Sequence, residues 1–529
     1  MCGFLGYKGT SVGRDELSRA FSRIEHRGPD DTKERQISGD VFFGFHRLAI
    51  MDLSHAGDQP FVSKSGEQYL MCNGEIYNYL DLEARFPDYT FSSKSDCEAL
   101  IPMLLEYGME HTCKELDAEF AFVFYDEVSG KLMAARDPIG IRPLFWGLTK
   151  EGERAFASEV KALESFCETV EPFPPGHYFD GDSLKPYRSI TGQLKNASLD
   201  FEKAVEGIRT GLEQGVVKRL QSDAPLGFLL SGGLDSSLVC AIAARYLNKP
   251  IKTFSIGSVY DAIDNKYAEQ VADYIGADHT TVTFDKEEAI SALSAVIESL
   301  ETWDVTTVRA SVGMYLVCKF IREHTDIKVL LTGEVSDELF GYKYTDFAPS
   351  PEEFQEESRK RVRELHYYDV LRADRCISAH SLEARVPFGD LSFVDHVMSI
   401  PAELKMNTYG HGKYLLRKAF EQGEYLPRDI LFREKAAFSD AVGHSLVDDL
   451  KEFASRQVSD TEFSSRKEKY PHGCPKTKEA FLYRKIFESK FPGRAELIPS
   501  LWLPNTSWEN CNVTDPSARV LPNYGKSGS

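Results

Sequence analysis

Short apolar stretches separated by turn residues fill the first 190 positions of the chain. They read VFFGFHRLAIMD (41–52), QYLMC (68–72), EFAFVFYD (119–126), KLMAARD (131–137), LFWGLT (144–149) and AFASE (155–159). The turn residues 127–130 between two of them predict a β-hairpin. Several strands with few long helices predict an α+β layered sandwich, with antiparallel sheets between helices.

Beyond residue 200 the pattern changes to alternating strands and helices. PLGFLLSGG leads into a helix near Ser236, and the apolar stretches IKTFSIG, HTTVTF and KVLLTGE follow, separated by helical periodicity. Such alternation predicts an α/β domain with a parallel sheet and helices on both faces. The charged stretch 352–375 predicts one solvated helix whose last turns face inward.

These changes of pattern divide the chain into two domains and a tail. We place the first domain at 2–190 and the second at 200–503, joined by the polar stretch SITGQLKNASLD (189–200). After Trp502 the chain is rich in Asn, Pro, Ser and Gly without periodicity, which predicts a flexible tail over 504–529.

Composition and charge exclude several functions. The 62 Lys and Arg against 82 Asp and Glu give a net charge of −20, the wrong sign for binding many phosphates, so we expect no nucleic-acid partner. No apolar run is long enough to span a bilayer, so we expect no membrane partner. The N-terminus also has no basic stretch followed by an apolar core, which predicts a cytoplasmic location. The 10 cysteines form no C-x-x-C pair, which disfavours a zinc knuckle or a secreted disulfide framework.

The second residue carries candidate chemistry. Removal of Met1 would place the α-amine and the thiol on the same residue, Cys2. Because an α-amine titrates near pH 7.7–8.0, part of it is neutral at pH 7 and can accept the thiol proton. Cys2 would then be a nucleophile with its own base.

Four further stretches follow Cys2 in order: HRGPDD (26–31), GFHRLAIMD (44–52), NGEIYN (73–78) and SKSDCEAL (93–100). Taken singly, each has a structural explanation. Asn73–Gly74 could form a hairpin turn, and Ser95 and Glu98 around Asp96 could form a helix capping box. Together, the four stretches resemble the class II glutamine amidotransferases, whose N-terminal-nucleophile domain hydrolyses glutamine.

That resemblance implies a role for each matched residue. Cys2 attacks the carboxamide, and the Asn73 side chain and the Gly74 N–H stabilise the oxyanion. Arg47 binds the α-carboxylate of glutamine, and Glu75 and Asp96 bind its α-ammonium. The adjoining Leu48, Ala49, Ile50 and Met51 complete the implied glutamine site.

The second domain carries SGGLDSS (231–237) directly after an apolar strand. Glycines that lead from a strand into a helix expose N–H groups to an anion, so the stretch predicts a phosphate cradle, although no Walker A motif is present. The full string resembles the PP-loop of ATP pyrophosphatases, which implies ATP and Mg²⁺ as cofactors. The implied pyrophosphate ligands are Ser231, Gly232, Gly233, Asp235, Ser236 and Ser237; Leu230, Ile256, Thr332 and Gly333 would surround the nucleotide; Asp235 and Asp337 would bind magnesium.

The remaining motifs narrow the resemblance. TWDVTTVRAS (302–311), LLTGEVSDELFG (330–341), YYDVLRADR (367–375), LEARVPF (382–388) and FREKAAFSD (432–440) resemble the glutamine-hydrolysing asparagine synthetases, and the likeness covers residues 1–500. It implies a ligase that converts L-aspartate, L-glutamine and ATP into L-asparagine, L-glutamate, AMP and pyrophosphate through β-aspartyl-AMP. A homodimer is compatible with it.

The same resemblance assigns the synthetase residues. Glu334 would serve the β-aspartyl-AMP step and take the proton from attacking ammonia. Arg309 and Lys435 would lie at the phosphates, Thr306 and Thr307 near the adenylation site, and Asp337 in the acidic loop; Arg372 and Arg385 match further family positions. For Lys435 and Arg385, an ordinary surface ion pair stays an alternative.

The acidic loop departs from the family pattern, because Val335 stands where a glycine is expected. A β-branched residue disfavours positive φ, so we expect this loop to sit differently and the reaction to be less efficient. The smaller Ala436 and Ala437 could alter the segment after Lys435.

Four rival functions are compared with this one. A β-lactam synthetase shares the two-domain plan but has no use for glutamine, so the complete Cys2, Arg47, Asn73 and Asp96 set disfavours it. Glucosamine-phosphate synthases and amidophosphoribosyltransferases share the first half only and lack SGGLDSS. A non-catalytic glutamine or nucleotide sensor would have no need of Cys2 and Glu334.

Overall fold

Two antiparallel six-stranded sheets form the N-terminal domain. The computed structural model describes residues 1–529 except 193–194, 197, 260–262, 434–443, 517 and 524–529. One sheet has the order β10-β8-β9-β1-β3-β2 and the other β12-β11-β7-β6-β5-β4. The strands are β1 (Gly3–Lys8), β2 (Asp31–Ile37), β3 (Val41–Arg47), β4 (Phe61–Val62), β5 (Gln68–Ile76), β6 (Ala118–Asp126), β7 (Lys131–Arg136), β8 (Phe145–Leu148), β9 (Arg154–Ala157), β10 (Thr169–Pro172), β11 (His177–Phe179) and β12 (Leu184–Pro186).

The two sheets pack face to face, with helices outside them. Phe4, Phe43 and Phe156 of one sheet meet Met71 and Val123 of the other in a buried cluster. The helices are α1 (Arg14–Ser22), α2 (Tyr79–Glu83) and α3 (Leu100–Glu115); the short 3₁₀ turn η1 (Glu25–Arg27) follows α1, and η3 (Asp96–Ala99) precedes α3. The predicted sandwich is confirmed, and so is the hairpin, because β6 pairs antiparallel with β7.

The C-terminal domain contains one five-stranded parallel sheet of order β15-β14-β13-β16-β17. Its strands are β13 (Leu226–Leu229), β14 (Lys252–Ser258), β15 (Asp278–Phe284), β16 (Val329–Leu331) and β17 (Glu383–Arg385). The sheet has a hydrophobic cluster on each face. Phe228 and Leu331 join the cluster of α4 and α5, whereas Ile256 and Leu330 join that of α7 and α8. The predicted α/β domain is therefore confirmed.

Helices make up most of the rest of this domain. They are α4 (Phe201–Lys218), α5 (Leu234–Tyr246), α6 (Ile263–Ile275), α7 (Lys286–Leu300), α8 (Val305–His324), α9 (Ser336–Phe340), α10 (Pro351–Glu364), α11 (Asp369–Ser378), α12 (Leu391–Ser399), α13 (Ala402–Lys405), α14 (Tyr414–Ala419), α15 (Arg428–Leu431), α17 (His444–Gln457), α18 (Asp460–Ser464), α19 (Arg466–Lys469) and α20 (Lys478–Lys490). No helix in the described part of the chain is long and apolar enough to cross a membrane.

Two predictions about this domain are wrong. The single helix expected over 352–375 is two helices, α10 and α11, separated by the turn η6 (Leu365–Tyr367) and by Tyr368, whose φ of −128° and ψ of −88° are not helical. The expected flexible tail is packed where it is described: Trp508 and Leu521 are buried and Cys511 is fully buried, all against Tyr344 and Phe354.

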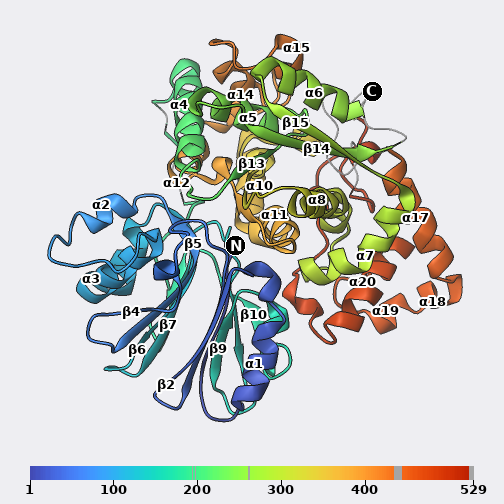
Figure 1. The fold of residues 1–529 in the computed structure, drawn as a ribbon. Coiled ribbons are helices and arrows are strands. Elements are labelled where there is room, and N and C mark those ends of the chain that lie inside the picture. Colours follow the sequence, from blue (N-terminus) through green and yellow to red (C-terminus); the bar gives the residue numbers. More distant parts are fainter. Residues whose placement is uncertain (193–194, 197, 260–262, 434–443, 517, 524–529) are drawn as a thin grey trace.

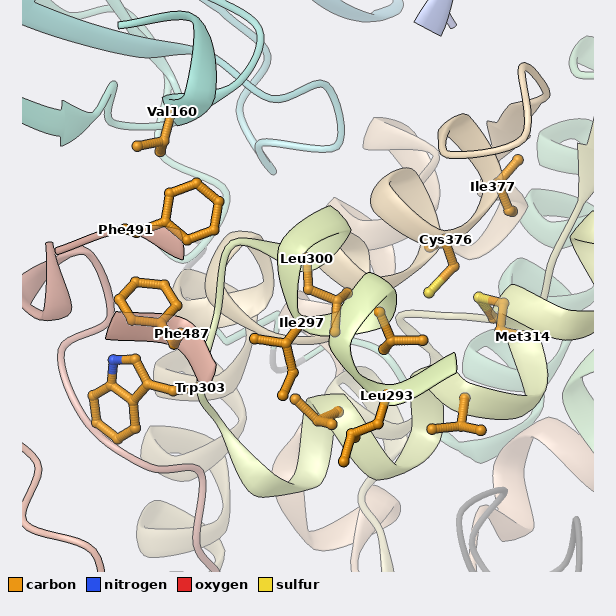
Figure 2. Close-up of a cluster of buried hydrophobic side chains, with 14 of the residues drawn as sticks. Val160, Leu293, Ile297, Leu300, Trp303, Met314, Cys376, Ile377, Phe487 and Phe491 are labelled. Carbon is orange, nitrogen blue, oxygen red and sulfur yellow. The ribbon is translucent and has the colours of Figure 1, made fainter. Parts of the chain in front are cut away.

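The two domains share one hydrophobic cluster. Figure 2 shows Val160 of the first domain beside Phe491 of the second, with Phe487 and Trp303 next to them. The N-terminus lies between the domains (Figure 1), and the Met1 side chain is completely buried there. The start of the chain is thus placed where the two domains meet.

Candidate active sites

Strand β5 brings Asn73 to the start of the chain. The Cys2 backbone N–H donates to Asn73 Oδ1 at 3.0 Å, and Cys2 Sγ lies 3.7 Å from the Leu48 carbonyl. Among the described residues, the buried Asn73 Nδ2 has no hydrogen-bond partner, so this donor is available to an oxyanion. Asn73 and Gly74 lie inside β5 and pair with β6, so the hairpin-turn interpretation is wrong.

Gly74 is required by the close approach of β6. A Cβ at this position would lie 2.5 Å from the Glu119 carbonyl oxygen, which is closer than any side chain can approach. The sequence places a glycine beside Asn73 because no other residue fits between these two strands.

Burial controls the ionisation of both candidate groups at the chain start. It raises the pKa of the Cys2 thiol to about 11 and lowers the pKa of the Met1 α-amine to about 6. The Met1 amine donates to the Leu382 carbonyl at 3.3 Å, so it is held in the second domain's sheet region. With Met1 attached, the thiol is therefore protonated at neutral pH.

The residues expected to bind the glutamine α-groups are ordered by other contacts. Arg47 Nη1 donates to Asp58 Oδ1 and to the Ser54 carbonyl, both at 2.7 Å, so it holds the loop after β3. Leu48, Ala49 and Ile50 are buried in that loop, and Met51 is partly exposed.

The two acidic candidates, Glu75 and Asp96, lie at the end of β5. Asp96 Oδ2 accepts the Ile76 N–H at 2.6 Å, and burial raises its pKa to about 6. Glu75 forms a 3.0 Å ion pair with Arg385 of the second domain; burial nevertheless raises its pKa. The expected capping box is wrong, because among the described contacts Ser95 makes no cap and the Glu98 carboxylate accepts from residues 92 and 93.

A cavity of about 230 Å³ lies at the carboxyl ends of β13, β14 and β16. This is the edge at which parallel sheets bind ligands. Most of the expected nucleotide residues line it: Leu230, Ser231, Gly233, Asp235, Ser236, Ile256, Thr332 and Gly333, together with Glu334, Asp337 and Arg372. Gly232 and Ser237 belong to the same loop but are not among its lining residues.

The loop before α5 has the form of an anion cradle. Gly233 precedes α5 and makes no side-chain cap among the described contacts, so the first N–H groups of the helix are available to a ligand. Gly232 has φ +67°, and a Cβ there would lie 2.7 Å from the Ala268 nitrogen. Only glycine fits this position.

Two carboxylates and a lysine meet at one side of the cavity. Lys413 Nζ lies 2.9 Å from both Asp235 carboxylate oxygens and 2.5 Å from Asp337 Oδ1, and Ser336 donates to Asp235 at 2.7 Å. Burial raises the pKa of Asp337, while the Lys413 ammonium opposes that shift. Carboxylate and hydroxyl oxygens are the donors that Mg²⁺ prefers, so these residues fit the implied metal.

Sequence reasoning missed Lys413. It lies 178 residues after Asp235 and belongs to none of the motifs singled out above, so only the fold brings the two together. Lys405, Asn407 and Arg417 also line the cavity and were missed for the same reason, whereas Arg433 lies inside the motif 432–440 but was given no role.

Glu334 faces Arg372 at 3.6 Å, and its Oε2 is buried without a hydrogen-bond partner among the described residues. Arg372 also contacts Asp369 at 2.8 Å. Val335 adopts φ +81° and ψ −22°. The expectation that a branched side chain keeps this loop out of the left-handed region is therefore wrong.

Several residues assigned to the synthetase site lie elsewhere. Arg309 is buried in ion pairs with Glu479 and Asp515, not at the cavity. Thr307 bonds to Asp304 at the start of α8, and the Thr306 hydroxyl donates to the Trp502 carbonyl.

Arg385 and Lys435 have different outcomes. Arg385 is completely buried between Glu75 and Glu383, so its interpretation as a surface residue is wrong, and it does not line the cavity. Lys435, with Ala436 and Ala437, lies outside the described residues.

The fold joins an antiparallel sandwich, with a thiol beside a free amide donor, to a parallel sheet with an anion-binding loop and an acidic cluster. Together these define a glutamine amidotransferase domain fused to a PP-loop synthetase domain. The glutamine amidotransferase domain family matches residues 1–188, and the asparagine synthase family matches residues 207–351 and 345–515. The chain is 41% identical to the glutamine-hydrolysing asparagine synthetases of Mus musculus, Gallus gallus and Homo sapiens, each over 99% of both chains. The chain belongs to the glutamine-hydrolysing asparagine synthetase family, which is a family of ligases.

Proposed function

We propose that this chain synthesises L-asparagine from L-aspartate and ATP, with ammonia released from L-glutamine, and that AMP, pyrophosphate and L-glutamate are the other products. The observation that supports it best is the pairing of two sites in one chain. Cys2 lies beside the free Asn73 amide donor, and Glu334 shares a cavity with the phosphate-binding loop.

The first half-reaction takes place at Cys2. Once Met1 is removed, the α-amine of Cys2 accepts the thiol proton, and the thiolate attacks the glutamine carboxamide. The Asn73 side chain and the Gly74 N–H stabilise the oxyanion, and the α-ammonium returns the proton to the leaving nitrogen so that ammonia departs. Water then hydrolyses the thioester to release glutamate and restore the Cys2 thiol. Arg47, Glu75 and Asp96 orient the substrate, and residues 48–51 border it.

The second half-reaction takes place in the synthetase cavity. The N–H groups at the start of α5 and the hydroxyls of Ser231 and Ser236 bind the ATP phosphates. Asp235 and Asp337 would hold magnesium, which would offset the charge of the phosphates. The aspartate β-carboxylate attacks the α-phosphorus, which expels pyrophosphate and gives β-aspartyl-AMP. Ammonia then attacks the acyl carbon and displaces AMP, and Glu334 accepts the proton that the ammonia loses.

Replacing one group in each site separates the two half-reactions. Cys2→Ala should abolish asparagine formation from glutamine and preserve it from ammonium salts. Glu334→Gln should preserve glutamate release and suppress AMP formation by about 100-fold, the scale of losing a positioned proton acceptor. Product analysis by mass spectrometry, with and without aspartate, measures both.

The outcomes of this experiment are distinct. Loss of ammonia-dependent synthesis in Cys2→Ala would contradict the division between the two domains. Unchanged AMP output in Glu334→Gln would remove Glu334 from the reaction. Glutamine or nucleotide binding without any product in the wild type would favour the sensor. The cytoplasmic location and the homodimer stay predictions.

A further inference from the structure

The C-terminal segment, described over residues 501–516 and 518–523, packs on the turn that follows the acidic loop. That turn, η5 (Lys343–Phe347), follows α9 after Gly341 and Tyr342. The Trp508 ring stacks on Tyr344 of the turn, with ring centroids 6.2 Å apart and 29° between the planes. The fully buried Cys511 thiol lies 3.7 Å from the Tyr344 carbonyl.

A buried polar cluster ties the same turn to the segment's first residues. Arg361 Nε contacts the Tyr344 hydroxyl at 3.0 Å and Glu357 at 2.8 Å, and Arg361 Nη2 donates to the Leu503 carbonyl at 2.6 Å. Asn505 Nδ2 donates to the other Glu357 oxygen at 3.0 Å. Buried charged groups are costly unless all their hydrogen bonds are made. The segment supplies the partners that α10 and the turn do not provide for Arg361 and Glu357.

Asn523, the last described residue of the segment, forms a second set of hydrogen bonds with the turn. Asn523 Nδ2 donates to the Lys343 carbonyl at 2.7 Å and to Asp346 Oδ2 at 2.9 Å. The other Asp346 oxygen accepts from Asn407 at 3.1 Å. Lys343, Asp346 and Asn407 all line the synthetase cavity.

The remaining contacts anchor the segment to α8 and α17. The Trp502 N–H donates to Asp304 at 2.6 Å, and Asp515 pairs with Arg309 at 2.8 Å and with Lys451 at 2.6 Å. Thr306 and Arg309, two of the residues that the motifs assigned to the synthetase site, are therefore used to hold this segment.

We propose that the C-terminal segment is a positioning element of the synthetase site, which sets the affinity for aspartate by holding the cavity wall formed by residues 342–346. The nucleotide residues lie on the loops after β13, β14 and β16, whereas this wall adds Lys343, Thr345 and Asp346. A wall with both charges suits an amino acid that carries an ammonium and two carboxylates. The inference rests on the proposed function of the same cavity.

Variants of the full chain test it. Trp508→Ala removes the ring that stacks on Tyr344, and Trp508→Phe restores a ring. Asn523→Ala removes the second tie at a position that is only partly buried, so folding is preserved. Glu509→Gln changes an exposed residue of the same segment and is the control.

We expect Trp508→Ala and Asn523→Ala to raise the KM for aspartate at least fivefold, with the KM for ATP and the rate of glutamate release within twofold of the wild type. Trp508→Phe should return the aspartate KM to within twofold, and Glu509→Gln should not change it. An unchanged aspartate KM in both alanine variants overturns the inference. Equal losses of kcat and of glutaminase activity also overturn it, because they would mean a general structural role. A wild type that forms no asparagine overturns the proposed function itself.

Discussion

At the scale of single residues, Val335 holds a backbone conformation that is unfavourable for a branched side chain. Its φ of +81° lies in the left-handed region, which costs an L-residue about 1–2 kcal/mol, while its side chain is buried. Val335 keeps Glu334 at the cavity only because the surrounding loop offsets this cost.

A glycine is usually less stabilising than an alanine, but at position 335 we expect the glycine variant to be the more stable of the two. Both lose the valine methyls, but only alanine retains the left-handed strain, so Val335→Gly should be more stable than Val335→Ala by about 1 kcal/mol. The midpoints of thermal unfolding of the two variants should differ by about 2 °C in favour of glycine. A higher midpoint for Val335→Ala would show that Val335 is not strained.

Asp96 gives a pH-dependent prediction. Its pKa is about 6 in the fold against 3.8 for the free side chain, so the folded state binds the proton more tightly. Its contribution to stability is present below about pH 4 and is lost as the pH rises through 6. Asp96→Asn removes a cost of roughly 2–3 kcal/mol at pH 8, from about 1.4 kcal/mol per pH unit.

We therefore expect Asp96→Asn to melt higher than the wild type at pH 8, with the difference shrinking as the pH falls toward 4, while the KM for glutamine rises. Asp88→Asn, at an exposed position, is the control and should change neither quantity. A difference in melting temperature that does not depend on pH would contradict the assignment.

For single residues, the sequence predicted which segments carry the candidate sites better than it predicted the partners of individual side chains. The structure brings Cys2 and Asn73 together and places most of the SGGLDSS loop at one cavity, while the roles of these residues stay predictions. Arg309 and Arg385 were misplaced, since a motif shows relatedness and does not tell which neighbour a long side chain meets. Lys413 could not be found, because its partner is remote in sequence.

At the scale of elements, the glutaminase site depends on how closely β5 approaches β6. Gly74→Ala would place a methyl 2.5 Å from the Glu119 carbonyl and push aside the strand that carries Asn73. Removing an oxyanion donor costs about 100-fold in rate, so glutamate release should fall by at least that factor. Gly13→Ala is the control, because a Cβ there meets nothing within 4 Å.

Ammonia-dependent asparagine synthesis should survive in Gly74→Ala, since the change lies in the first domain only. Assays with glutamine and with ammonium chloride, run side by side, measure this. Equal loss of both activities would mean that β5 supports the whole molecule and not the glutaminase site.

The order and type of most elements were predictable, whereas their ends and breaks were not. Strand alternation and hairpin turns are local signals, so the sandwich and the parallel sheet could be read from the pattern. The break between α10 and α11 depends on packing around Leu365, and the tail is ordered by Trp508 and Cys511 on Tyr344. Both are tertiary effects that no local pattern carries.

At the scale of the whole molecule, helix α11 joins the two sites. The Asp374 carboxylate on this helix accepts two hydrogen bonds from Arg27, at 2.9 and 3.0 Å. Arg27 Nε in turn donates to the Cys2 carbonyl at 2.8 Å. Half a turn earlier, Arg372 faces Glu334 at 3.6 Å. Helix α11 therefore contacts the Cys2 backbone through Arg27, and it contacts Glu334 directly through Arg372.

Asp374→Asn should weaken this connection more than either active site. Losing the carboxylate leaves the completely buried Arg27 short of a partner, and breaking a buried ion pair costs about 3–5 kcal/mol. Because the Cys2 backbone is then held less firmly to α11, we expect glutamine hydrolysis to be less tightly coupled to asparagine synthesis. We expect the ratio of glutamate to asparagine formed to rise above 1, with ammonia-dependent synthesis retained.

Glu462→Gln, which breaks an exposed pair with Lys485, is the control and should leave the ratio unchanged. An unchanged ratio in Asp374→Asn would mean that α11 carries the two contacts without coupling them.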